Sequence, residues 1–279
     1  MKAGNNVRRS FRFVTRSSGV QSPHEMPAPL RRILKIGGIT LAAIIVLIVG
    51  AAAVVFGPFL VTRRPIVDGF EVEGIRILQN GIVTLAVVPV GPGEVVLVDG
   101  GTDTSGEAVL ADLSRHNLTA DAVKAILVTH GHGDHTGAAV AFPLADVMAL
   151  EAEAVAIEAG SQGPAGIKVA SRLADGQTVT IGSNTIRVFA IPGHSPGHAA
   201  YVVNGVLFLG DAAIADRDGT LQNAHWFFSE DTEQNRGSLK RLYERLIADN
   251  VEIKAIACAH SGVMTNGIVA LAEFARAVP

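Results

Sequence analysis

The longest apolar stretch of the chain runs from residue 36 to residue 61. Its 26 residues carry no charge, 20 of them are hydrophobic, and Thr40 supplies the one polar side chain. A helix of this length extends about 39 Å, more than the ~30 Å hydrocarbon core of a bilayer. The pattern therefore predicts a transmembrane helix at 36–61, through which the protein contacts a membrane.

Basic residues are concentrated before this stretch. Residues 1–35 hold eight Lys and Arg against one acid, Glu25, and Arg63 and Arg64 follow the stretch. Because positive charge marks the cytoplasmic side of a membrane segment, we expect a basic cytoplasmic arm at 1–35. The segment at 36–61 is then a single-pass signal-anchor in the cell membrane, and the remainder lies outside the cytoplasm.

A cleaved export signal is the alternative to an anchor. Arg31-Arg32 before the apolar stretch resembles a twin-arginine signal, with Arg8-Arg9 as a weaker match, and Ala51-Ala52-Ala53 offers small residues to a peptidase. The stretch is longer than the apolar region of a signal peptide, which favours the anchor.

Beyond residue 67, short apolar runs alternate with segments of helical spacing. Strands are predicted at 70–78, 82–89, 95–98, 125–128, 146–150, near 169, and at 178–181, 185–190, 201–203, 206–209 and 253–257. Helices are predicted at 105–118, 151–159, 232–248 and 264–277. In the third helix Asp231 is the expected cap, and an apolar stripe indicates a face packed on the core. This alternation predicts one α/β domain at 67–279.

Composition changes this picture in two respects. The chain has a single cysteine, Cys258, which excludes an internal disulfide framework and an all-cysteine zinc site. Residues 67–279 hold 13 Lys and Arg against 25 Asp and Glu, so the net charge of −3 is an average over a basic arm and an acidic domain. An acidic domain lacks the basic surface that nucleic acid requires, so no nucleic-acid partner is expected.

Histidines carry the clearest chemical signal. After the strand at 125–128 comes Thr-His-Gly-His-Gly-Asp-His-Thr-Gly, which places His130, His132, Asp134 and His135 within six positions. Imidazole and carboxylate are preferred zinc ligands, and alternate residues of an extended loop project the same way. We therefore predict a metal site in this loop, with zinc expected and iron or manganese as alternatives.

The motif His130-x-His132-x-Asp134-His135 at a strand end resembles the signature of the metallo-β-lactamase-fold hydrolases, glyoxalase II among them. The later metal-ligand positions of that family match His194 in Pro192-Gly193-His194, Asp211 in Gly210-Asp211, and His260, in order along the chain. The resemblance covers 67–279 and implies a four-layer αββα sandwich for this part of the chain. The transmembrane helix predicted at 36–61 lies before it, outside the resemblance. The resemblance also implies two zinc ions, one held by His130, His132 and His194, the other by Asp134, His135 and His260, with Asp211 bridging both.

By the same resemblance, the protein is a metal-dependent hydrolase that uses a metal-bridging hydroxide, with Asp134 as a catalytic residue and Asp99 supporting the ligand loop. The expected substrate is a small molecule with an ester, thioester or lactone bond. Glyoxalase II binds glutathione through a long helical C-terminal region, whereas only 19 residues follow His260 in this sequence, which disfavours a glutathione substrate. An iron-dependent sulfur dioxygenase of the same fold, or a metal-binding sensory module without turnover, remains an alternative. Metal identity, substrate and oligomeric state stay open.

Two features near these residues have more than one interpretation. His198, in Pro196-Gly197-His198, is expected to be structural, although its motif position suggests closeness to the site. The aromatic run at 225–228, His-Trp-Phe-Phe, is expected to pack in the core, with a wall of the substrate pocket as the alternative.

Overall fold

The computed structural model describes residues 28–279, apart from the side chains of Arg31, Pro58 and Phe59. The chain divides into two compact units, one ending at Gly57 and the other spanning Pro58–Pro279. Most of the predicted arm at 1–35, including Arg8-Arg9, lies outside the described residues. Helix α1 (Ala28–Thr62) contains the apolar stretch and begins eight residues before it. Its segment Ala28–Gly57, with a mean hydropathy of 3.0, is long and apolar enough to cross a membrane.

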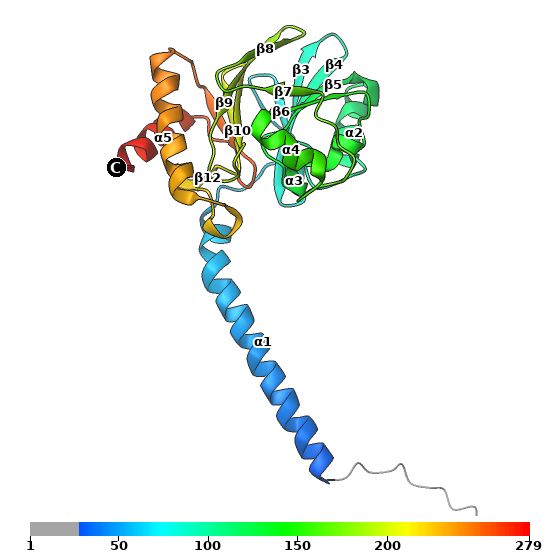
Figure 1. The fold of residues 1–279 in the computed structure, drawn as a ribbon, viewed down its shortest axis with the longest axis vertical. Helices are drawn as coiled ribbons and strands as arrows, with labels where there is room; N and C mark the ends of the chain where they lie inside the picture. Colours follow the sequence, from blue (N-terminus) through cyan, green and yellow to red (C-terminus); the bar gives the residue numbers. More distant parts are fainter. Residues whose placement is uncertain (1–27) are drawn as a thin grey trace, which may run out of the picture. The chain divides into compact units, whose positions relative to one another are not determined.

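The second unit contains two mixed β-sheets (Figure 1). The first sheet has seven strands in sequence order: β1 (Phe70–Val72), β2 (Ile75–Asn80), β3 (Val83–Gly91), β4 (Glu94–Val98), β5 (Val123–Leu127), β6 (Asp146–Leu150) and β7 (Ser171–Leu173). Strands β1 to β4 pair antiparallel, and β4 to β7 pair parallel. The parallel part is buried on both faces, as its continuous Val, Ile and Leu runs predict.

The second sheet has five strands in the order β14, β11, β10, β9, β8. Their bounds are β8 (Thr178–Ile181), β9 (Asn184–Ala190), β10 (Ala199–Val203), β11 (Val206–Gly210) and β14 (Ala255–Cys258). The pair β11 and β14 is parallel, and the other pairs are antiparallel. A separate hairpin joins β12 (Ala213–Ala215) to β13 (Leu221–Asn223).

Helices cover the outer face of each sheet. The first sheet packs against α2 (Glu107–Arg115) and α4 (Glu151–Ala159), and the second against α5 (Thr232–Ala248) and α6 (Gly267–Ala277). The inner faces meet in a core that both sheets fill, with Leu127 and Tyr201 among its buried side chains. Shorter helical segments are η1 (Ala120–Ala122), α3 (Gly133–Thr136), η2 (Gly137–Val140) and η3 (Trp226–Phe228). The result is the predicted αββα sandwich.

Most predicted elements are present with small shifts at their ends. The helices at 151–159 and 232–248 have the predicted bounds, and Asp231 accepts a hydrogen bond from the Gln234 amide at 2.8 Å, as a helix cap does. The predicted strand at 70–78 is wrong as a single strand, because Glu73 and Gly74 adopt left-handed backbone conformations and divide it into a hairpin. The hairpin of β12 and β13 was not predicted.

One edge of the sandwich gathers the chain segments that carry the predicted ligands. Strands β4 and β5 are parallel, so Asp99 and the loop starting at His130 leave the first sheet at its carboxyl edge. In the second sheet β9, β11 and β14 run in one direction, and they lead to His194, Asp211 and His260. The two sheets are joined here by a hydrogen bond from the Thr84 amide to the Ala259 carbonyl at 2.8 Å.

Candidate metal centre

Three imidazole nitrogens from distant parts of the chain face one another. His130 Nε2 lies 2.9 Å from His132 Nδ1 and 3.1 Å from His194 Nε2, and the latter two nitrogens are 3.2 Å apart. Three nitrogens cannot all satisfy one another by hydrogen bonds, since each pair needs one donor and one acceptor. Ligands placed tetrahedrally about 2.0–2.1 Å from a zinc ion are themselves separated by about 3.3 Å. The spacing therefore fits a shared metal ion.

A second group lies beside the first. His135 Nε2 is 3.8 Å from Asp134 Oδ1, and His260 Nε2 is 3.4 Å from Asp134 Oδ2. Asp211 completes this group, with its Oδ1 3.2 Å from His135 Nε2 and its Oδ2 3.1 Å from His260 Nε2. The ligand atoms of the four residues all lie within 4.8 Å of one another, as do those of the first group together with Asp211.

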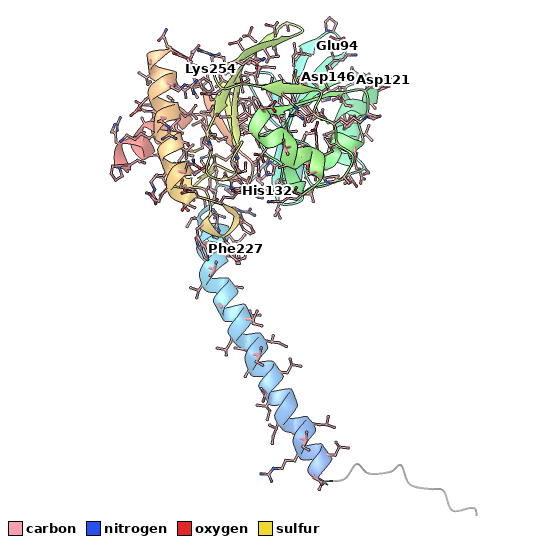
Figure 2. The ribbon with its side chains drawn as sticks, in the orientation of Figure 1. Glu94, Asp121, His132, Asp146, Phe227 and Lys254 are labelled. Atoms are coloured by element: carbon pink, nitrogen blue, oxygen red, sulfur yellow. The ribbon has the colours of Figure 1, made fainter. Side chains whose placement is uncertain are left out.

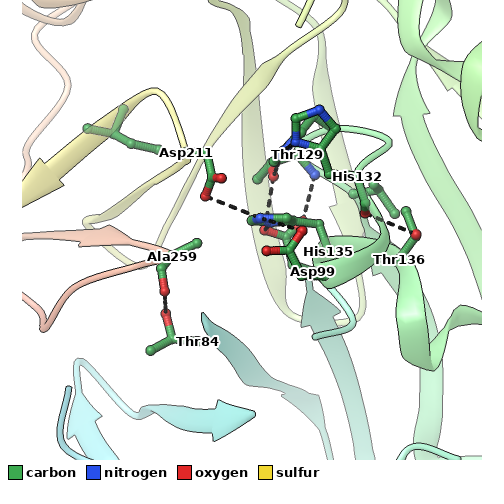
Figure 3. Close-up of polar contacts among 12 residues, drawn as sticks. Thr84, Asp99, Thr129, His132, His135, Thr136, Asp211 and Ala259 are labelled. Atoms are coloured by element: carbon green, nitrogen blue, oxygen red, sulfur yellow. Dashed lines mark hydrogen bonds and ion pairs between the residues drawn. The ribbon is translucent and has the colours of Figure 1, made fainter. Parts of the chain in front are cut away.

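Asp211 therefore belongs to both groups. Figure 3 shows its carboxylate facing the ring of His135. Asp211 Oδ2 also lies 3.7 Å from His194 Nε2 of the first group. Within the described chain, its buried Oδ1 and the buried Nε2 of His135 lack a partner with hydrogen-bond geometry. Buried polar atoms without partners are rare, because desolvation is costly. A pair of cations between the groups would satisfy them, so the residues present fit two metal ions.

The outward nitrogens of four histidines are held by oxygen atoms. His135 Nδ1 lies 2.8 Å from Asp99 Oδ2, and His260 Nδ1 lies 3.2 Å from the Ile82 carbonyl. Carboxylate and carbonyl oxygens only accept, so each of these nitrogens donates a proton, and Nε2 is the nitrogen left to face a metal ion. His130 Nδ1 and His194 Nδ1 similarly face the hydroxyls of Thr129 and Ser229, at 3.1 Å each.

The Thr129 and Ser229 hydroxyls can accept those protons because each donates its own elsewhere. The Thr129 hydroxyl lies 2.9 Å from Asp99 Oδ2, which also receives the His135 proton, and the Ser229 hydroxyl lies 2.9 Å from the His225 carbonyl. Asp99 is buried and also accepts the Thr129 amide at 2.8 Å. The expectation that Asp99 supports the ligand loop agrees with these contacts.

Burial keeps the first group in the neutral form that binds metal. It lowers the pKa of His130 well below its ordinary value, lowers that of His132, and lowers that of His194 to about 4. The charged form of a buried imidazole is disfavoured because it loses its hydration. At neutral pH these three rings therefore carry lone pairs rather than charge.

The second group behaves differently because it contains carboxylates. Burial acts to raise the pKa of Asp211, but the charges of His135 and His260 hold it well below its usual value. Burial acts to lower the pKa of His260, yet Asp211 and Asp134 together raise it to about 9. The group is thus a cluster of anions that attracts positive charge, whether protons or metal ions.

Comparison with known proteins gives the family. The family model of the metallo-beta-lactamase superfamily matches residues 80–256. The chain belongs to this superfamily. It is 32% identical over 186 residues to a hydroxyacylglutathione hydrolase of Serratia proteamaculans, an alignment that covers 67% of this chain and 62% of that relative.

Solved structures of the superfamily share the fold. A metallo-beta-lactamase family protein from Thermus thermophilus is 24% identical, with a TM-score of 0.56 over 74% of this chain and 79% of that one. The BLEG-1 B3 metallo-beta-lactamase is 28% identical, with a TM-score of 0.53 over 70% of this chain and 95% of that one.

The structure of this superfamily member brings all seven predicted ligand residues to one place. It also shows Glu153, in the first turn of α4, which the sequence analysis missed. This buried carboxylate accepts the Gly131 amide at 2.8 Å through Oε1, and the Ser195 hydroxyl at 3.0 Å and the Gly197 amide at 2.9 Å through Oε2. Glu153 therefore joins the loop of His130 and His132 to the loop of His194.

His198 has the structural role expected of it. Its ring is fully buried and stacks on that of His130, with 4.7 Å between ring centroids. Its Nε2 donates to the Leu209 carbonyl at 3.0 Å, on the strand that leads to Asp211. Gly210, at the end of that strand, has a φ of +51°, and a Cβ there would lie 2.9 Å from His198 Nε2. Close packing around His198 thus places Asp211.

The expectation of core packing for the aromatic run at 225–228 is wrong. Trp226, Phe227 and Phe228 are 63%, 57% and 54% exposed. They form η3, which His225 caps by accepting the Phe227 amide at 3.3 Å. A run of aromatic residues cannot reveal burial by itself, because a three-residue helical turn has no periodicity that separates an inner from an outer face.

A small cavity opens beside His132. Its volume is about 100 Å³, and Glu153, Gln162, Ser195 and Glu230 are among its lining residues. Carboxylate, amide and hydroxyl groups line it together with apolar atoms, as in sites that fix the orientation of a small ligand. His132 is the one predicted ligand among the residues that line this cavity.

Proposed function

We propose that this chain is a membrane-anchored, extracytoplasmic dizinc hydrolase that cleaves an ester, thioester or lactone. The observation that carries the proposal is the position of the Asp211 carboxylate, which reaches a group of three histidines and a group of two histidines and Asp134. When bound, two zinc ions lower the pKa of a water between them and polarise the substrate oxygen.

The chain's own residues have separate roles in this proposal. His130, His132 and His194 would hold one ion in the neutral form that burial enforces. Asp134, His135 and His260 would hold the other, and Asp211 would be a ligand of both. Asp134 is the most exposed of the carboxylates, with 25% of its side chain accessible against 9% for Asp211. It can therefore accept a hydrogen bond from the attacking nucleophile and take up its proton.

Metal content and turnover of the full-length protein in detergent test the catalytic part. We expect about two zinc ions per chain and hydrolysis of at least one member of a panel of esters, lactones and thioesters. The panel includes a hydroxyacylglutathione, because relatives that share about 30% identity are named for its hydrolysis.

The same measurements distinguish the alternatives. One iron ion per chain with oxygen consumption on a persulfide would identify a sulfur dioxygenase instead. Bound metal without turnover of any panel member would favour a sensory module.

The membrane topology has its own test. The apolar length of α1 and the basic excess before it support a cytoplasmic N-terminus and an exported domain. A phosphatase that requires export, fused after Val61, is expected to be active, and the same enzyme fused before Arg31 is expected to be inactive. The reverse pattern would overturn the orientation, and release of the domain from membranes would favour a cleaved signal.

A further inference from the structure

Three adjacent aromatic side chains are exposed at the surface of the domain. Trp226, Phe227 and Phe228 are each more than half exposed, and Trp226 is the single tryptophan of the chain. Scattered apolar residues on a surface are ordinary, but three large neighbouring rings form a patch. Tryptophan in particular is enriched where a protein meets the boundary between lipid headgroups and acyl chains.

The patch lies at the rim of the metal centre. Ser229, directly after it, accepts a hydrogen bond from His194 Nδ1, and the Glu230 amide donates to the His194 carbonyl at 3.1 Å. Figure 2 shows Phe227 and His132 toward the same end of the domain. Across the site, Ile82 is 62% exposed and its carbonyl contacts His260. Apolar side chains thus stand on two sides of the ligands.

Residues 62–64, where α1 ends, are hydrogen-bonded to the β12–β13 hairpin of the domain. Thr62 accepts the Arg217 amide at 2.9 Å through its carbonyl, and its hydroxyl lies 3.3 Å from Gln222 Nε2. The Arg64 amide donates to the Ala215 carbonyl at 2.7 Å, so both strands of the β12–β13 hairpin are tied to the helix exit. Trp226 follows Gln222 by four residues, a span of at most about 14 Å.

The ligand His260 is tied to the same exit. The Arg63 guanidinium donates to the His260 carbonyl at 3.2 Å, and the Gly262 amide donates to the Arg64 carbonyl at 2.9 Å. A 26-residue apolar helix exceeds the ~30 Å hydrocarbon core by about 9 Å, which places its end in the headgroup layer. The membrane anchoring proposed above therefore brings residues 62–64, and the hairpin and His260 that are bonded to them, next to that layer.

Charged side chains of both signs stand at the opposite end of the domain, where Lys124 lies 3.6 Å from Glu94. Glu94, Asp121 and Asp146 stand at or just before the amino ends of β4, β5 and β6, the edge away from the ligands (Figure 2). Ionised side chains are costly to move from water toward acyl chains, so this end is suited to face water. Charge and apolar surface therefore give the domain one orientation toward a membrane.

We propose that Trp226, Phe227 and Phe228 insert into the headgroup layer of the membrane that holds α1, and that they keep the metal centre open toward the bilayer surface. The proposal rests on the membrane anchoring proposed above. It adds a substrate class, namely an amphiphile that presents its ester, thioester or lactone at the depth of the headgroups and keeps its acyl chain in the bilayer.

The fluorescence of Trp226 tests the docking directly. The full-length protein is reconstituted in phosphatidylcholine vesicles that contain lipids brominated either near the headgroup or near the acyl-chain end. We expect blue-shifted emission that shallow bromines quench strongly and deep bromines quench weakly. The matched control combines Trp226→Phe with Leu144→Trp, because Leu144 is 76% exposed just before β6, at the edge away from the ligands. Its emission is expected to stay unquenched.

Each outcome decides the proposal. Absence of quenching at Trp226 overturns it, and blue-shifted emission without quenching indicates that a second copy or another protein covers the patch instead. Equal quenching of Trp226 and of the Leu144→Trp control also overturns it, because the domain would then have no fixed orientation.

Turnover separates this proposal from the proposed function. In a Trp226→Ser, Phe227→Ser variant, we expect the rate on a long-chain nitrophenyl ester in vesicles to fall about tenfold relative to the rate on nitrophenyl acetate in water. An unchanged ratio overturns the substrate class. Lack of turnover on both esters in the metal-loaded wild type counts against the ester hydrolase, while the quenching result still decides the docking.

Discussion

Replacement of Glu153 by glutamine tests how the two ligand loops are held together. The side chain keeps its shape, but one carboxylate oxygen becomes an NH2 group. If that group takes the Oε2 position, it faces the Gly197 amide, and if it takes the Oε1 position, it faces the Gly131 amide. The Ser195 hydroxyl can turn and accept instead of donating. In either orientation one buried backbone N–H loses its acceptor.

The magnitude follows from that single loss. A buried donor left without a partner costs about 1–3 kcal/mol, so we expect the free energy of unfolding to fall by this amount. Partners that orient metal ligands typically contribute about 10–100-fold to metal affinity, and Glu153 orients the loops of three ligands at once. We therefore expect zinc affinity of the first group to fall within that range.

Two measurements check this prediction on the full-length protein in detergent. Urea unfolding followed by circular dichroism gives the stability, and competition with a chelator gives the zinc affinity. The control is Glu151→Gln in the same helix, where the side chain is 65% exposed and pairs with Arg172 at 2.8 Å. An exposed pair contributes little, so its stability should change by less than about 1 kcal/mol. Equal results for the two variants would refute the bridging role of Glu153.

Three further changes test other parts of the site. Asp211→Ala is expected to lower the metal content from about two ions per chain to about one or fewer, as elemental analysis would show. The control His116→Ala, at the end of α2, is expected to leave the metal content unchanged. In the chelated protein, the raised pKa of His260 predicts a contribution to stability that is complete below about pH 6.5 and is lost as the pH rises through about 9. Zinc-loaded protein should not lose stability over this range, and thermal unfolding at several pH values checks both forms. Gly193 has a φ of +138°, and a Cβ there would overlap the backbone of Asn235, so Gly193→Ala should destabilise the fold by more than about 1–3 kcal/mol. Gly69 has a φ of +69° but open space around it, so Gly69→Ala should lose less; urea unfolding compares the two variants.

The layout of the domain could be predicted from local pattern. Alternating apolar runs and helical spacing gave one α/β domain, and the helix at 232–248 was predicted to its last residue because its cap and its apolar stripe are both local signals. The turn at Glu73 and Gly74 was missed, since a strand and a tight hairpin share the same apolar residues and differ only in backbone conformation.

The candidate ligands were also readable from the sequence. His130, His132, Asp134 and His135 lie within six positions, and His194, Asp211 and His260 each follow a buried strand. Chemistry of this kind is local, because metal-binding residue types at loop positions have few other uses. That these residues bind two ions stays a prediction, but their closeness in space agrees with it.

Burial and orientation were decided only by the tertiary structure. In the sequence, Glu153 is one of three acids in a helix that looks solvated, and it becomes a buried acceptor because the start of α4 packs between two loops more than 60 residues apart, at His130 and His194. Trp226 and its neighbours look like core residues, yet they are exposed and do not belong to the core that α5 and the second sheet form. Sequence pattern determines which side chains a segment offers, whereas long-range packing determines which of them are enclosed and what they face.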